Sequence, residues 1–180
     1  MATLRIPVGA SDHVQGSPDA PVTLVEYGDY ECPHCGAAYP VVQQLQQRFG
    51  DDLRFVFRNF PLAEMHPNAV SAAMAAEFGA AHKRFWEFHD ALFENQQQLG
   101  PDLYAAIAAE VGLAAAQIPA ALESTEYLEH VRADFNGGVR SGVNGTPTFF
   151  VNGARYEGAP GAEAMGEALE RAIRAKRKAK

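Results

Sequence analysis

The sequence predicts an α/β fold in which a mixed sheet carries a helical insertion, and three observations predict it. A strand pattern, a helix pattern and a second strand pattern follow one another between positions 22 and 57. An Ala-rich stretch with helical spacing and no strand pattern comes next. Strand patterns return near position 148 and precede a last helix. The order βαβ, helical block, ββα therefore predicts a four-stranded mixed core sheet.

The first three elements form a βαβ unit. Residues 22–27 are a short β-branched run between Pro and Gly, which predicts a strand. Residues 37–49 place apolar side chains on one helical face and glutamines opposite, and Gly50 ends the helix. Residues 53–57 alternate between apolar and polar, so they form the second strand. The two strands should be parallel, since a helix connects them.

The remaining elements follow from the same patterns. Residues 7–21, rich in Pro, Gly, Ser and Asp, predict an irregular lead-in. Asn152-Gly153 is a strong hairpin signal between two short strands. The predicted helices of the block are 67–80, 82–95, 101–111, 115–122 and 125–140, and the predicted end comprises strands 148–151 and 154–157 and helix 163–176. We therefore expect residues 1–61 and 142–180 to form the sheet domain and residues 62–141 to form the insertion.

Composition and charge narrow the classes of function. The chain has 180 residues, of which 47% are apolar and 21% charged, as in a soluble globular protein. The formal net charge is −7, but residues 171–180 hold six of the fifteen basic residues and no acidic one, which leaves −13 for the rest. The negative charge of residues 1–170 would repel the phosphates of a nucleic acid, so no nucleic-acid partner is expected.

The two cysteines, Cys32 and Cys35, directly follow the first strand and open the first helix. The free N–H groups of a helix N-terminus favour a thiolate at Cys32, which makes Cys32 the nucleophile. Pro33 preorganises the first turn, and His34, when protonated, favours the thiolate further. Cys35, one turn deeper, is placed to resolve a mixed disulfide formed at Cys32.

Two other interpretations of the cysteine pair carry less support. The pair is either inert and buried, or half of a zinc site completed by two of His34, His66, His82 and His89. No second Cys-x-x-Cys and no His-x-x-x-His accompanies it, so we expect no metal and no cofactor. Four histidines are expected to be polar surface or helix residues, namely His66, His82, His89 and His130. The glutamine run 96–98 is expected to be a solvated helix face.

With Cys32-Pro33-His34-Cys35 at the strand-to-helix turn, a helical insertion, and Thr146-Pro147-Thr148 before the final ββα, the chain resembles the DsbA-like branch of the thioredoxin superfamily, from about residue 20 to 175. The resemblance implies a thioredoxin fold and thiol–disulfide exchange with protein substrates. It also implies a buried acid at Glu26, a helix kink at Pro40, a cis-proline at Pro147 facing the cysteines, and a backbone at Thr146 that pairs with extended substrate.

Some side chains can also be interpreted from the sequence without the resemblance. Glu26 shares a strand face with Val22 and Leu24, so burial is expected to raise its pKa and make it a proton carrier. The alternative is that Glu26 is a surface acid at a strand end, with its hydrogen-bonding groups satisfied. Arg58, on the neighbouring strand, is a candidate partner for Glu26. An aromatic cluster in the insertion is expected to be partly core and partly a substrate-facing apolar patch, and it comprises Phe85, Trp86, Phe88 and Phe93.

The direction of the reaction stays open at this point. The disulfide oxidases of this branch usually have Val where this chain has Thr146, and Thr is typical of their isomerase-like relatives. A DsbA-like oxidase is the favoured interpretation. The alternatives are a cytosolic disulfide reductase of the same fold, or a peptide-binding or chaperone module in which the dithiol is only a redox latch. Relatives with other chemistry, such as glutathione transferase kappa, generally lack the paired cysteines.

Partners and location complete the expectations. The N-terminus has no apolar stretch of signal-peptide length and the chain has no transmembrane run, which predicts a cytoplasmic protein without membrane insertion. A periplasmic or extracellular location is the alternative if the chain is a mature form. The expected partners are protein substrates with thiols or disulfides, and a redox-recycling partner or glutathione. We expect a monomer.

Overall fold

Five strands form one mixed sheet in the order β1-β3-β2-β4-β5, in a computed structural model that describes residues 1–179. The central strand β2 is parallel to β3 and antiparallel to β4. This arrangement confirms the α/β fold with four core strands, to which β1 adds an edge strand. The strands are β1 (His13–Gln15), β2 (Val22–Gly28), β3 (Leu53–Asn59), β4 (Thr148–Val151) and β5 (Ala154–Arg155).

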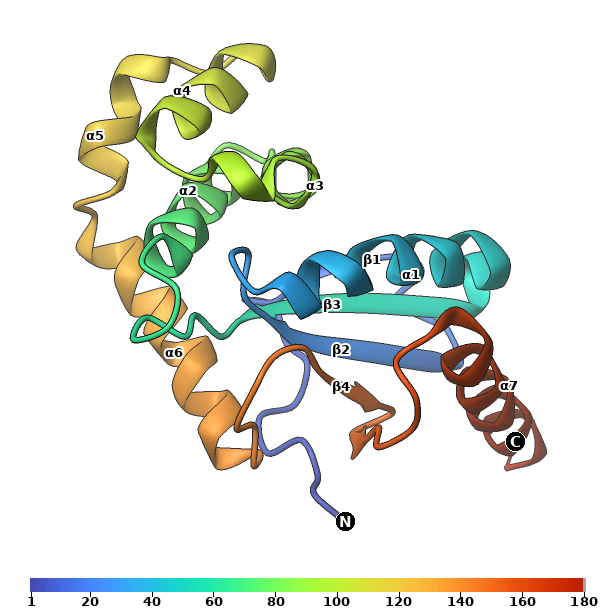
Figure 1. Cartoon of the computed structure of the whole chain (residues 1–180). Coiled ribbons are helices and arrows are strands. Elements are labelled where there is room, and N and C mark those ends of the chain that lie inside the picture. The colour runs from blue at the N-terminus through green and yellow to red at the C-terminus, as the bar shows by residue number, and fades with distance from the viewer. Residues whose placement is uncertain (180) are drawn as a thin grey trace.

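The helices fall into two groups. Helix α1 follows β2 and lies along the sheet, and α7 packs beside α1 at one end of the sheet (Figure 1). Helices α2 to α5 gather beyond the other end, and α6 runs back towards the sheet. The helices are α1 (Pro33–Phe49), α2 (Ala69–Ala81), α3 (Phe85–Glu94), α4 (Pro101–Glu110), α5 (Ile118–Ala121), α6 (Thr125–Arg140) and α7 (Ala162–Lys178). Short 3-10 turns are η1 (Gly50–Asp52), η2 (Gln96–Gln98) and η3 (Ala115–Gln117).

The prediction of an irregular lead-in over residues 7–21 is wrong at β1. Residues 13–15 pair antiparallel with β3, with His13 opposite Phe57 and Gln15 opposite Phe55. A three-residue strand is too short to show a period in the sequence. It forms because the free edge of β3 offers unpaired backbone N–H and C=O groups.

Several predicted boundaries also move. Helix α1 begins at Pro33, so the dithiol opens the helix as predicted, and the apolar spacing of 37–49 belongs to the same helix. The helix predicted at 82–95 begins at Phe85, since Lys83 has a positive φ of 59° that a helix does not accept. The helix predicted at 115–122 divides into η3 and α5. Pairing in the last hairpin ends at Arg155, two residues before the predicted end.

Hydrophobic clusters cover both faces of the sheet. On one face, Val22 and Leu24 belong to the larger cluster, which also holds Leu45 of α1 and Leu169 of α7. On the other face, Val25 and its neighbours form a second cluster. Because β2 is covered on both sides, all its residues except Thr23 are buried, as expected of a central strand.

Arg58 does not pair with Glu26, so that expectation is wrong. Glu26 lies opposite Phe57 in the register, and the next residue along β3 points to the other face of the sheet. There the Arg58 guanidinium donates to both carboxylate oxygens of Asp12 at 2.7 and 2.9 Å, and to the Tyr27 hydroxyl at 2.9 Å. This buried pair ties the N-terminal segment to the sheet.

Candidate active site

The dithiol lies where β2 ends and α1 begins. Cys32 is the N-cap residue of α1, with an extended backbone, and Pro33 occupies the first helical turn. The Cys32 N–H donates to the carbonyl of Asp29 at 3.1 Å, which closes the turn between strand and helix. Both thiols are buried, Cys32 being 4% exposed and Cys35 0%. Pro40 lies inside α1, as predicted.

The two sulfur atoms differ in acidity. A hydrogen bond from the Cys35 thiol lowers the pKa of Cys32 to about 5 against the opposing effect of burial, with help from the backbone N–H groups of Cys35 and His34. Burial raises the pKa of Cys35 far above its ordinary value, and the hydrogen bond to Cys32 adds to this. Cys32 is therefore the thiolate and Cys35 its proton-bearing donor.

His34 contributes to the site through its backbone. Its imidazole is exposed, and it lines a cavity of about 330 Å³ beside the dithiol. Its backbone N–H is one of the groups that favour the Cys32 thiolate. The electrostatic role of its side chain stays a prediction.

Thr146 and Pro147 lie opposite the cysteines, although 114 residues separate Thr146 from Cys32. The Thr146–Pro147 peptide bond is cis. Cys32 Sγ lies 3.5 Å from the Thr146 carbonyl oxygen, which accepts a hydrogen bond when Cys32 is in its thiol form. The Thr146 hydroxyl is buried and has no hydrogen-bond partner within residues 1–179. The loop thus presents backbone directly to the reactive sulfur.

Glu26 lies beneath the dithiol, on the face of β2 that carries Val22 and Leu24. It is 3% exposed, and burial, followed by the charge of Cys32, raises its pKa to about 8. Gly28 leaves room for this arrangement, because a Cβ there would lie 2.5 Å from the Phe57 ring and 3.0 Å from Glu26 Oε1. A carboxyl group of this kind holds or accepts a proton near neutral pH.

Asp29 is a site residue that the sequence analysis missed. Its backbone N–H donates to Cys35 Sγ at 3.4 Å. Its carboxylate accepts hydrogen bonds from the backbone N–H groups of Glu31 and Leu62 and from His66 Nδ1, at 2.8, 2.9 and 2.8 Å. The sequence shows only an acid in a turn, and no local signal points to partners more than thirty residues away.

Gln96 also touches the active-site turn, so the expected solvated face at 96–98 is wrong at this residue. Its Nε2 donates to the carbonyls of Tyr30 and Cys32, both at 2.8 Å. These bonds satisfy two acceptors of the turn that carries the nucleophile. The 3-10 turn η2 therefore holds the dithiol turn in place from the side of the insertion.

The aromatic cluster lies mainly in the core, and its substrate-facing role stays a prediction. Phe85, Phe88 and Phe93 are buried, and only Trp86 is partly exposed. His89 lies on helix α3, in keeping with the expected surface or helix position, but it is buried among these rings and not at the surface. Its Nδ1 lies 3.1 Å from the Tyr30 hydroxyl, and burial lowers its pKa to about 3, which keeps the ring neutral.

Comparison with known proteins agrees with this geometry. The profile of the family described as "Thioredoxin" matches residues 10–171. The crystal structure of oxidised BdbD from Bacillus subtilis superposes with a TM-score of 0.86 at 27% identity, covering 96% of this chain and 98% of that one. A thioredoxin-like oxidoreductase from Silicibacter pomeroyi gives 0.78 at 30% identity, covering 94% of each chain. α-DsbA1 from Wolbachia pipientis shares the fold, with 0.80 at 20% identity, 97% of this chain and 96% of that one.

Several proteins of related sequence are named as Na(+)/H(+) antiporters. "Na(+)/H(+) antiporter NhaA 1" of Mycobacterium sp. (strain KMS) is 43% identical over 162 residues, which are 88% of this chain and 26% of that protein. The chain thus spans about a quarter of the length of the curated relatives it matches. Among residues 1–179, no helix has both the length and the apolar character needed to cross a membrane.

Proposed function

The chain is a thiol–disulfide oxidoreductase of the thioredoxin family, in its DsbA-like branch, and from that premise we propose that it works as a disulfide oxidase on protein substrates. The observation that carries the proposal is the stabilised thiolate at Cys32, whose pKa is lowered to about 5. A reduced form stabilised in this way makes the disulfide form the stronger oxidant. In exchange with a substrate dithiol, the equilibrium therefore favours transfer of the disulfide to the substrate.

The reaction is two successive exchanges. A substrate thiolate attacks Sγ of Cys32 in the oxidised protein, the Cys32–Cys35 bond breaks, and Cys35 leaves as a thiolate that takes a proton. A second substrate thiolate then attacks the substrate sulfur, a substrate disulfide forms, and Cys32 leaves as a thiolate. Two electrons pass from two substrate thiols to the cysteine pair.

Glu26 supplies the proton that Cys35 needs in the first exchange. Its pKa of about 8 keeps the carboxyl group protonated at neutral pH, and it is buried on the side of the sheet that faces the dithiol. Because the pKa of Cys35 is raised far above its ordinary value, the Cys35 thiolate is strongly basic and takes this proton readily.

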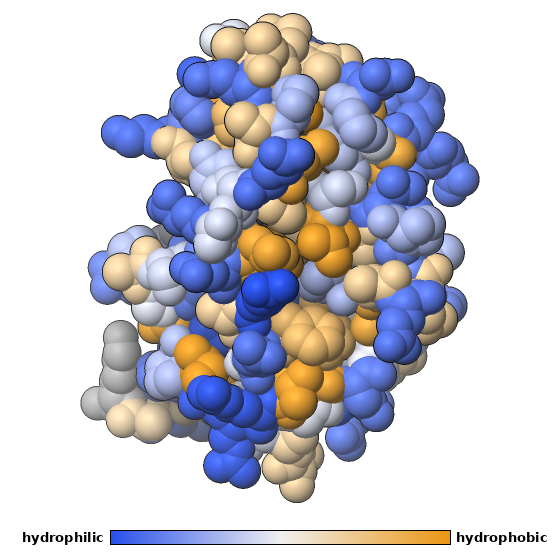
Figure 2. Space-filling model, turned by 90° about the vertical axis from the view of Figure 1, so that its left-hand side faces the viewer, coloured by the Kyte–Doolittle hydropathy of each residue, from blue (hydrophilic) through white to orange (hydrophobic). Residues whose placement is uncertain are grey.

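Substrate binds as an extended segment across the Thr146 backbone. The neighbouring cavity, between α1 and the Pro147 loop, is lined in part by Ala38, Val41 and Met165 and accepts one apolar side chain of the substrate. Hydrophobic side chains also gather near the middle of one face of the molecule, with hydrophilic residues around them (Figure 2). Such surfaces suit unfolded polypeptide, which exposes both backbone and apolar side chains.

The cellular location of the protein follows from the proposed direction of its reaction, which is oxidation of substrate thiols. Cytosolic thiols are kept reduced, so a dithiol that favours its reduced form would stay reduced there and oxidise nothing. We therefore place the protein outside the cytoplasm, in the periplasm or beyond, in place of the cytoplasmic location expected from the sequence. A membrane-bound or soluble oxidant must then restore the disulfide.

The deciding experiment is the equilibrium of the Cys32–Cys35 pair with a glutathione buffer. An oxidase has a potential towards the value of about −120 mV known for DsbA, whereas a potential near the thioredoxin value of about −270 mV would overturn the proposal. Oxidative refolding of a reduced substrate should be lost in Cys32→Ser. A protein that is redox-silent but prevents aggregation would instead be the chaperone module.

A further inference from the structure

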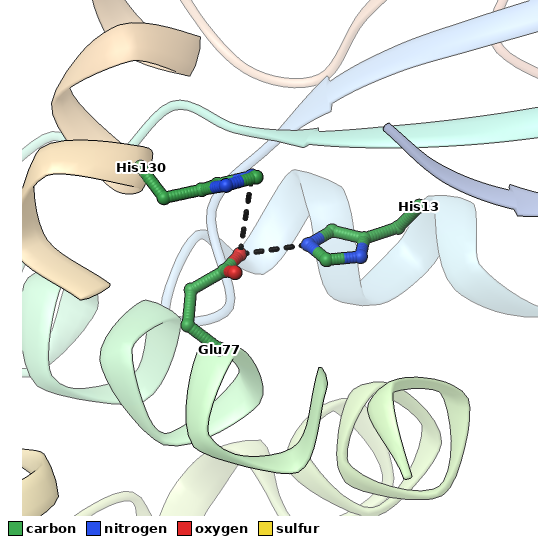
Figure 3. Close-up of side chains that lie close together, drawn as sticks. All are labelled: His13, Glu77 and His130. Carbon is green, nitrogen blue, oxygen red and sulfur yellow. Dashed lines mark hydrogen bonds and ion pairs between the residues drawn. The ribbon is translucent and has the colours of Figure 1, made fainter. Parts of the chain in front are cut away.

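A second cluster of side chains lies apart from the dithiol, where β1, α2 and α6 meet (Figure 3). His13 comes from β1, Glu77 from α2 and His130 from α6. One nitrogen of each imidazole and one oxygen of the carboxylate all lie within 4.8 Å of one another. Figure 3 shows both rings pointing towards the carboxylate.

The spacing within the cluster suits one small cation. His13 Nε2 lies 2.8 Å from Glu77 Oε1, and His130 Nε2 lies 3.6 Å from the same oxygen. Zinc bonds of about 2.0–2.1 Å to His and about 2.0–2.2 Å to carboxylate, at tetrahedral angles, place neighbouring donor atoms about 3.3–3.5 Å apart. The His130 distance lies close to that value, whereas the 2.8 Å between His13 and Glu77 is a hydrogen-bond distance, which lengthens by about 0.5 Å when both atoms bind the ion.

The donor atoms are held by a second layer of contacts. Asn59, which is 1% exposed, donates from Nδ2 to Glu77 Oε1 at 2.9 Å and to Asp134 Oδ2 at 3.1 Å. The His13 ring stacks on Phe85, with centroids 3.6 Å apart. Metal sites in proteins depend on such outer contacts to orient their ligands.

Charge in the cluster also favours a dication. The Glu77 side chain is 5% exposed and that of Asp134, 3.6 Å from His130 Nε2, is 14% exposed, so two carboxylates lie close together with little solvent. Buried charges need compensation. One divalent cation supplies it, and nitrogen donors select zinc or a similar first-row metal over calcium and magnesium.

We propose that His13, Glu77 and His130 bind one Zn²⁺ ion, which leaves a fourth position for water. The ion would join the edge strand of the sheet to two helices of the insertion and so stabilise their packing. The sequence pattern predicted no metal because 64 residues separate His13 from Glu77 and the third ligand lies on another helix, so no short motif exists.

The test is a metal titration of the oxidised, chelator-treated protein, in which the cysteines form a disulfide and cannot act as ligands. Co²⁺ should give visible absorption bands at one equivalent, and Zn²⁺ should remove them. Zn²⁺ should raise the Tm, while Ca²⁺ and Mg²⁺ should leave it unchanged. No binding at one equivalent, or stabilisation by Ca²⁺ in place of Zn²⁺, would overturn the proposal.

Variants identify the ligands. His13→Gln and His130→Gln should each weaken Co²⁺ binding by at least about 100-fold, because one of three protein ligands is lost. His82→Gln is the matched control, since His82 is an exposed histidine at the end of α2 and lies outside the cluster. Binding that survives both ligand variants, or that His82→Gln abolishes, would contradict the assignment.

Discussion

His66 Nδ1 lies 2.8 Å from Oδ2 of Asp29, a carboxylate whose side chain has no exposed surface. The pair joins the loop after β3 to the turn that carries the nucleophile, because the Asp29 backbone also bonds to both cysteines. A histidine expected at the surface is thus part of the support beneath the dithiol.

His66→Gln should lose a pH-dependent part of the stability. Burial opposes protonation of His66, but the hydrogen bond and charge of Asp29, with the charges of Cys32 and Glu31, raise its pKa above the ordinary value. Because the pKa of His66 is raised in the folded state, its interaction with Asp29 stabilises the protein fully below about pH 6.5. This contribution is lost as pH rises through the folded-state pKa. The variant should be about 1 kcal/mol less stable in mild acid.

Urea unfolding of the oxidised protein at several pH values measures this difference. In the oxidised form Cys32 has no thiolate, so the titration of His66 is not mixed with that of the nucleophile. The gap between variant and wild type should shrink as the solution becomes alkaline. A gap that stays constant with pH would mean that His66 acts only through packing.

Cys35→Ala should raise the pKa of Cys32. The Cys35 thiol is the largest contributor to the lowered value of about 5, and alanine has no donor. We expect a rise of about 1–2 pH units, read from the ultraviolet absorbance of the thiolate against pH. Cys35→Ser keeps a hydroxyl donor and should give a smaller rise. Equal pKa values in all three proteins would assign the effect to the helix N-terminus alone.

Glu26→Gln should stabilise the reduced protein at neutral pH. Burial, with the charge of Cys32, raises the pKa of Glu26 from 4.5 to about 8, so between these values the folded state keeps a proton that the unfolded state has released. Wild-type stability therefore falls as pH rises through this window and levels off above it. At pH 7 the gain in the variant should be roughly 3 kcal/mol.

Denaturation at acid pH is the control for Glu26→Gln. Below about pH 4.5 both states of the wild type hold the proton, and the two proteins should have nearly equal stability. The same variant should slow the first exchange with substrate, because amide nitrogen supplies no proton to Cys35. A variant that is no more stable at pH 7 would remove the argument for a protonated Glu26.

Asp12→Asn should destabilise the protein by about 3 kcal/mol, since it leaves the buried Arg58 guanidinium without its counter-charge. The side chains of Arg58 and Asp12 are only 3% and 7% exposed. Burial favours the protonated acid, but the hydrogen bonds from Arg58 and from the Gly9 N–H, together with the charge of Arg58, outweigh it and lower the pKa of Asp12. The pair thus contributes above about pH 3.8, and this contribution is lost as pH falls through the lowered pKa.

Asp52→Asn is the matched control for that prediction. Asp52 also pairs with an arginine, Arg177, but both side chains are well exposed, and such pairs contribute about 0–1 kcal/mol. Guanidinium unfolding of the two variants compares a buried with an exposed ion pair in one protein. Similar losses in both would show that burial does not decide the effect.

Patterns with a short period determined much of the fold. The alternation in 53–57, the helical spacing of 125–140 and the Asn152-Gly153 turn each depend on neighbouring residues only, and each element formed where predicted or within a few residues. The position of Cys32 and Cys35 between a strand and a helix was also visible, because a helix N-terminus follows directly from local sequence.

Only the tertiary structure decided which distant residues meet. The Thr146 carbonyl beside Cys32, the Asp29–His66 pair, the β1 edge strand and the cluster of His13, Glu77 and His130 all join segments far apart in the chain. No period or spacing encodes such contacts, since they arise when whole elements pack. The sequence therefore determined the reactive dithiol, and packing determined the burial, hydrogen bonds and charges that set its acidity.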